Sequence, residues 1–244
     1  MSMKKAAGRD FLVLAALGLV ALFLAMSRPL NPLAFIAGSA IVGLIVWLGL
    51  AAAAPFGKGA PLLAETTDPA AARQPAVRVV AKALSSGLLL GAALLSVIVF
   101  IIIPFEPQAG ARLQAAANQP FWKPWVVAFE SAVIEELAGR LFLIGGAVWL
   151  LSRFFRPVGG KPRRSVTGIA IALSVIAFGA IHLPAWLGIV AHPTAILIVV
   201  VMVLNGLGGL LFSYAFWRWG IEAAILCHFA ADIVTQVIGP RLVS

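Results

Sequence analysis

Charged residues are scarce in this chain of 244 residues: 11% are Asp, Glu, Lys or Arg, whereas 62% are hydrophobic. A soluble domain is about one quarter charged, so this composition excludes a soluble globular protein and indicates an integral membrane protein. Cysteine is rarer still, with Cys227 alone, which excludes an intramolecular disulfide and argues against redox chemistry. The sequence also lacks His-Glu-x-x-His, the usual signature of a zinc protease.

Acidic residues are outnumbered by basic ones, 9 against 18, for a net charge of +9. The basic residues are scattered over short loops between apolar runs. A nucleic-acid-binding protein gathers them on one face, so we expect no nucleic-acid partner. The scattered pattern is the one that orients a chain in a membrane.

Several apolar runs reach the length of about 20 residues that a helix needs to cross a bilayer. We predict an all-α, polytopic membrane bundle of about seven transmembrane helices, eight at most. Residues 1–80 are predicted to form a transmembrane hairpin with a cytoplasmic linker, and residues 81–244 the single membrane domain that carries the site. The seven predicted spans cover roughly residues 11–27, 33–54, 83–105, 125–151, 165–190, 194–217 and 220–238, and a short interfacial helix is expected within 106–124.

The distribution of Lys and Arg over the connecting segments predicts a cytoplasmic N-terminus. With that orientation, thirteen basic residues lie in cytoplasmic segments, Arg73 among them, and four in outer segments. The alanine-rich composition, with arginine preferred over lysine, indicates a bacterial chain and therefore the inner (cell) membrane. The four outer residues are Arg28, Arg112, Lys123 and Arg241.

The fourth apolar run carries an unusual set of charges, Glu135, Glu136 and Arg140. An ionisable group at the centre of a bilayer costs roughly 2.5–3.5 kcal/mol on insertion scales, so such groups mark functional sites. Residues four apart share a face of a helix, and we expect Glu136 to pair with Arg140 while Glu135 points elsewhere.

Two later runs each contribute a histidine. His182 follows Phe178 by four residues, and His228 precedes Asp232 by four, so each pair shares a helix face. A carboxylate and an imidazole can deprotonate a water for attack on a peptide carbonyl, and a second imidazole can stabilise the oxyanion that forms. Two histidines and a glutamate can instead hold Zn²⁺. These residues favour a hydrolytic site, and they are compatible with both a metal-free site and a zinc site.

Depth along the helices creates a difficulty for this cluster. Counted from the cytoplasmic ends at 1.5 Å per residue, Glu135 and His182 lie about 20–25 Å deep, but His228 only about 12 Å. Tilted or unequal helices are needed to bring them together.

These motifs resemble, in order and spacing, those of the CPBP (ABI) family of intramembrane proteases, which includes type II CAAX prenyl endopeptidases and bacteriocin self-immunity proteins. The matching residues are Glu-Glu-x-x-x-Arg at 135–140, Phe-x-x-x-His at 178–182 and His-x-x-x-Asp at 228–232. The resemblance implies an intramembrane endopeptidase with a buried polar active site.

The resemblance also assigns roles. Glu135 and His182 would activate the water, while His228 and Asp232 would form the oxyanion site. Where this chain has Asp232 the family often has Asn, and an ionised aspartate would repel an oxyanion. Asp232 would therefore act protonated or by orienting His228. The supporting residues would be Glu136, Arg140 and Phe178.

The resemblance leaves the cofactor and the substrate open. Family members are described as metalloproteases and as metal-free glutamate proteases; a zinc ion would be held by Glu135, His182 and His228. The implied partners are membrane lipid and a peptide or lipidated protein substrate, such as a prenylated CAAX protein or a leader peptide. Two other functions fit buried polar groups, a non-proteolytic scaffold or immunity protein and a proton-coupled transporter.

Overall fold

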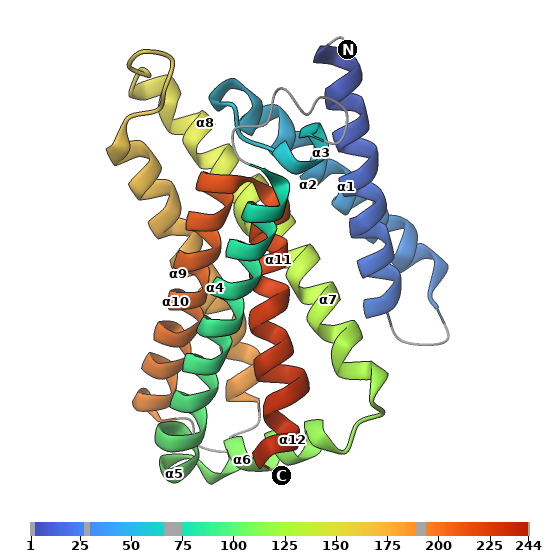
Figure 1. Cartoon of the computed structure of the whole chain (residues 1–244), viewed down its shortest axis with the longest axis vertical. Coiled ribbons are helices and arrows are strands. Elements are labelled where there is room, and N and C mark those ends of the chain that lie inside the picture. Colours follow the sequence, from blue (N-terminus) through green and yellow to red (C-terminus); the bar gives the residue numbers. More distant parts are fainter. Residues whose placement is uncertain (1–2, 27–29, 66–74, 189–193, 244) are drawn as a thin grey trace.

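The computed structural model describes residues 3–26, 30–65, 75–188 and 194–243, so Arg28 and Arg73 lie outside the described residues. Within these ranges the chain forms helices and no β-strand, packed as an elongated bundle (Figure 1). The predicted all-α polytopic fold is confirmed.

Helices of very different length make up the bundle. The α-helices are α1 (Met3–Ala25), α2 (Pro32–Ala53), α3 (Pro61–Glu65), α4 (Ala76–Val97), α5 (Ile103–Phe105), α6 (Pro107–Ala117), α7 (Trp122–Glu136), α8 (Gly145–Phe154), α9 (Arg164–Leu187), α10 (Ala195–Trp219), α11 (Ile221–Asp232) and α12 (Gly239–Val243). A 3₁₀ turn, η1 (Ala54–Phe56), and three π-helical stretches, η3 (Ile98–Ile102), η4 (Leu137–Ile144) and η5 (Ile233–Ile238), continue some of them.

Six helical runs in the described residues are long and apolar enough to cross a membrane. The predicted span that carries Glu135 is not one of the six; it is the continuous run α7–η4–α8. The short helix expected within 106–124 is α6, which lies along the lower end of the bundle (Figure 1). The six runs are Gly8–Ala25, Pro32–Phe56, Ala76–Phe105, Arg164–Leu187, Ala195–Trp219 and Ile221–Leu242.

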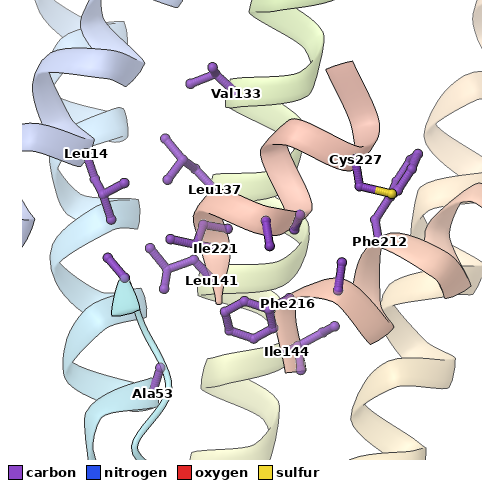
Figure 2. Close-up of a cluster of buried hydrophobic side chains, with 14 of the residues drawn as sticks. Leu14, Ala53, Val133, Leu137, Leu141, Ile144, Phe212, Phe216, Ile221 and Cys227 are labelled. Atoms are coloured by element: carbon purple, nitrogen blue, oxygen red, sulfur yellow. The ribbon is translucent and has the colours of Figure 1, made fainter. Parts of the chain in front are cut away.

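The N-terminal hairpin packs on the helical run that carries the two glutamates. Helix α1 contacts α2 and α7, and α2 contacts η4 and α8. Leu14 of α1 lies near Leu137 of η4 in Figure 2. The division of the chain near residue 80 stays a prediction, although this packing joins the hairpin closely to the rest.

A hydrophobic core fills the bundle beside the polar residues. Leu137, Leu141 and Ile144 of η4 meet Phe216 of α10 and Ile221 of α11, and all five are at most 1% exposed (Figure 2). Leu137, Leu141 and Ile144 follow Glu136 along the same helical run, toward α8 and its connection to α9.

The turn between α10 and α11 is recessed from the end of the bundle where α8 connects to α9 (Figure 1). The segment 57–65 covers it: Ile221 N donates to the Gly59 carbonyl at 2.9 Å, and Leu63 N donates to Glu222 Oε1 at 2.9 Å. Gly220 adopts φ 105°, where a side chain is strained, and a Cβ there would overlap Pro61. Because α11 begins inside the bundle, the depth mismatch expected for His228 disappears.

Helix α4 approaches α11 closely because glycines face the contact. A Cβ on Gly87 would overlap the carbonyl oxygen of Cys227. We expect Gly87→Ala to force the helices apart and destabilise the protein by about 1–3 kcal/mol, as overpacking does. Gly146→Ala is the matched control, since a Cβ added at Gly146 would meet no atom within 4 Å. Thermal unfolding in detergent checks this, and equal midpoints for the two variants would contradict it.

Candidate active site

The four residues predicted to form the catalytic centre meet in one place, at the junction of α7, α9 and α11. Glu135 Oε2 lies 3.7 Å from His182 Nε2 and 3.9 Å from His228 Nε2. Asp232 Oδ2 lies 3.5 Å from His228 Nε2. The structure thus brings together side chains that are nearly 100 residues apart in the sequence.

His182 is oriented by its own helix. Its Nδ1 lies 2.7 Å from the carbonyl oxygen of Phe178, one turn earlier. A carbonyl only accepts, so Nδ1 carries the proton of this bond. In the neutral ring Nε2 is therefore an acceptor, and it faces Glu135.

His228 is oriented by a residue from another helix. Its Nδ1 lies 2.9 Å from Glu136 Oε1, and the same oxygen pairs with Arg140 Nη1 at 3.1 Å. Glu136 and Arg140 are both fully buried. The predicted Glu136–Arg140 pair is present, and Glu136 has a second task that sequence reasoning missed, which is to hold His228.

Arg140 joins this ion pair to two more helices. Its Nη2 donates to the Gly209 carbonyl of α10 at 3.1 Å, and its guanidinium lies 4.3 Å from the centre of the Phe178 ring of α9. A Cβ on Gly209 would lie 3.3 Å from Nη2, tighter than most such contacts. A small residue here keeps the arginine close to the carbonyl.

Two aromatic rings form a wall beside His228. Phe212 stacks on the imidazole with ring centres 4.4 Å apart and an interplanar angle of 13°. Phe178 meets the same imidazole edge to face at 5.8 Å. Phe178 was expected to support the site, whereas Phe212 was not identified, because nothing in its local sequence distinguishes it from other apolar residues of the sixth run.

Asp232 has a partner on α7. Its Oδ2 lies 2.7 Å from Ser131 Oγ, which is also 2.8 Å from the Val127 carbonyl oxygen. A hydroxyl has one proton, so Ser131 donates to only one of these oxygens at a time.

Three π-helical stretches adjoin the site or its cavity. η4 begins directly after Glu136, η5 directly after Asp232, and η3 lines the adjoining cavity through Ile98 and Ile102. Such turns are rare and occur frequently at functional sites. They change the helix register just beyond the reactive side chains.

A cavity of about 520 Å³ leads from this cluster toward α6. Glu135 lines it, and Glu135 Oε2, the atom that faces both histidines, has no hydrogen-bond partner in the described part of the protein. This oxygen is a buried acceptor on a residue that lines the cavity. The cavity is lined by residues of α4, α6, α7, α9, α10 and α11 and by the stretches that continue them, among them Ile98, Leu113, Lys123, Glu130, Trp186, Asn205, Phe212 and Pro240.

Among the residues that the structure describes, no three histidine, cysteine, aspartate or glutamate side chains are arranged to hold a metal ion. The set suggested for Zn²⁺, Glu135, His182 and His228, is together in space without forming such a group.

Buried carboxylates beside imidazoles, on helices of a membrane bundle and next to a cavity, define an integral membrane protein with an intramembrane polar site. Residues 117–234 match the family model described as type II CAAX prenyl endopeptidase Rce1-like. The part of the chain that carries every residue of this site thus belongs to the CPBP/CAAX protease family, which implies a peptidase acting on a peptide or protein substrate. No curated protein and no solved structure matches the chain significantly.

Proposed function

We propose that this protein is an intramembrane endopeptidase that hydrolyses a membrane-associated peptide or lipidated protein with a water activated by Glu135 and His182. The supporting observation is Glu135 Oε2, a buried acceptor without a hydrogen-bond partner among the described residues. It lies 3.7 Å from His182 Nε2, on a residue that lines the cavity. That separation is too long for a direct hydrogen bond, so Glu135 Oε2 keeps its capacity to accept a hydrogen bond from a water.

In the first step Glu135 takes a proton from the water. The water oxygen attacks the carbonyl carbon of the scissile peptide bond at the same time. His182 Nε2 accepts the second hydrogen bond and fixes the direction of attack. The electron pair of the C=O bond moves to oxygen, which becomes the oxyanion of a tetrahedral intermediate.

We assign His228 and Asp232 to the stabilisation of this charge. The Nδ1–H of His228 donates a hydrogen bond to Glu136. The imidazole can therefore donate a second hydrogen bond, from Nε2 to the oxyanion, only when both ring nitrogens are protonated. When the intermediate collapses, the C=O bond re-forms and the C–N bond breaks. The leaving amine takes the proton held by Glu135, which leaves a new carboxyl terminus and a new amino terminus.

Glu136, Arg140 and Phe178 act on the position of His228 rather than on the substrate. Glu136 holds Nδ1 of the imidazole, Arg140 neutralises Glu136, and Phe178 packs against both the guanidinium and the imidazole. Their burial keeps the imidazole in one orientation, as a preorganised site requires.

In our proposal, protein groups alone perform this reaction. We expect the purified enzyme to keep its full rate after treatment with a strong chelator. Peptide cleavage before and after chelation measures this. A loss of rate that zinc restores would show instead that Glu135, His182 and His228 hold a metal.

Asp232 is expected to act by hydrogen bonding. Asp232→Asn keeps a hydrogen-bonding group within reach of Ser131 and His228, so the kcat of this variant should stay within about tenfold of the wild type. Asp232→Ala removes that group, and its kcat should fall by about 10²–10³-fold, as it does when an oxyanion-site donor is lost. Steady-state kinetics on one peptide compares them. Equal loss in both variants would show that the negative charge itself is required.

The proposed function is tested with purified protein in lipid nanodiscs and a library of quenched peptides. The library pairs each CAAX-type peptide with and without a farnesyl group, and includes leader peptides. We expect cleavage of at least one class, located by mass spectrometry of the products. If no member is cut by the folded protein while Glu135→Ala leaves its cellular effect unchanged, the scaffold interpretation replaces the protease.

A further inference from the structure

The cavity has one end at the active site and the other at the surface near α6. Gln119 and Lys123 line it at the outer end and are both exposed, and Pro240 of α12 lies beside them. Helices α6 and α12 lie together at the lower end of the bundle in Figure 1. The cavity therefore opens at this end.

The path from the site to the opposite end is closed. Behind His228 lie the buried Glu136–Arg140 pair and then the core of Leu141, Ile144 and Phe216, each 0% exposed (Figure 2). The dense packing leaves no route for water or a peptide between these side chains. Among the described residues, the cavity that reaches Glu135 therefore opens toward α6 and not toward the opposite end.

The two ends of the bundle differ in basic residues. The closed end has those near the start of α4, around the α8–α9 connection and at the end of α10, whereas the described side chains near the open end include Lys123 and Arg241. Basic loops stay in the cytoplasm. The closed end is the cytoplasmic one on this criterion, and the open end faces outward. The basic residues of the closed end include Lys58, Arg78, Lys82, Arg153, Arg156, Lys161, Arg163, Arg164 and Arg218.

We infer that this protease receives its substrate from the extracytoplasmic side of the membrane, so that its substrate is an exported or membrane-anchored polypeptide. This inference rests on the proposed function. A lipidated protein anchored in the cytoplasmic leaflet would lie at the closed end, on the wrong side of the core.

The length of the cavity adds a requirement on the substrate. Lys123 and Glu135 are twelve residues apart on one helix, about 18 Å at 1.5 Å per residue. An extended chain covers about 3.3 Å per residue, so about five residues must enter before a peptide bond reaches Glu135. The substrate presents an unfolded, largely apolar stretch of at least this length.

Cysteine accessibility tests the side of entry without requiring catalysis. Val127→Cys places a thiol in the cavity, while Val126→Cys places one at the same depth on a neighbouring face that does not line the cavity. Lys161→Cys marks the α8–α9 connection, and the native Cys227 is buried. With a small, charged, membrane-impermeant thiol reagent on intact spheroplasts, Val127→Cys should react, Val126→Cys should not, and Lys161→Cys should react only after lysis.

Cleavage by sealed vesicles provides the second arm. An impermeant peptide that the detergent-solubilised enzyme cuts should be cut by right-side-out vesicles and not by inverted ones. Reaction of Val127→Cys only from the side that labels Lys161→Cys, or no reaction from either side, would overturn the inference. If the enzyme cuts no peptide even in detergent, the proposed protease function fails, whereas the labelling pattern still decides which side the cavity faces.

Discussion

Glu135→Gln is expected to lower kcat for peptide cleavage by about 10²–10⁴-fold, the usual contribution of a general base. The amide has the same shape as the carboxyl group and cannot take a proton from water. Because the substrate is held mainly by the rest of the cavity, KM should change little. Steady-state kinetics in nanodiscs separates the two constants.

The matched control for this variant is Glu106→Gln. Glu106, next to the end of α5, does not line the cavity. Its Oε1 accepts a hydrogen bond from Thr194 Oγ1 at 2.8 Å, and a glutamine oxygen can accept it too. The control should keep the wild-type rate. Equal rates for Glu135→Gln and Glu106→Gln would show that Glu135 does not activate the water.

Arg140→Leu should have the largest effect on stability. It leaves the fully buried Glu136 carboxylate without its cation, and breaking a buried ion pair costs about 3–5 kcal/mol. The Gly209 carbonyl also loses its donor. We expect little folded protein, with a strongly lowered midpoint of thermal unfolding in detergent.

Two further variants show whether this loss comes from the orphaned charge. Adding Glu136→Gln to Arg140→Leu removes the uncompensated carboxylate and should restore part of the stability, while activity stays low because His228 has lost its charged partner. Arg153→Ala removes an arginine that packs over Trp149 at 4.2 Å, and should cost no more than about 1 kcal/mol. A double variant no more stable than Arg140→Leu would contradict the electrostatic explanation.

The helices and the local pairs were predictable because they depend on spacing alone. Apolar run length predicted the spans, and the i, i+4 rule predicted the pairing of Glu136 with Arg140 and the shared face of His228 and Asp232. The convergence of Glu135 with the two histidines was expected from the ionisable residues of three apolar runs and from the family resemblance. No spacing rule predicts it, since it joins three separate helices.

Contacts between helices were not predictable from one sequence. The bond from His228 to Glu136 and the contact of Asp232 with Ser131 depend on how α11 is rotated and inserted against α7. The insertion itself depends on the segment 57–65, which caps the recessed start of α11 through Gly59 and Leu63. No spacing rule links that segment to α11, so the depth of His228 was underestimated.

Hydrolysis of an identified peptide in water enriched in ¹⁸O, by the wild type and by Glu135→Gln side by side, tests the central claim most directly. Mass spectrometry of the products reports both the rate and the source of the new carboxyl oxygen. The wild type should form a carboxyl terminus with one ¹⁸O atom, and the variant should form almost none of this product in the same time. Cleavage by Glu135→Gln at the wild-type rate would contradict the assignment of Glu135 as the group that activates water.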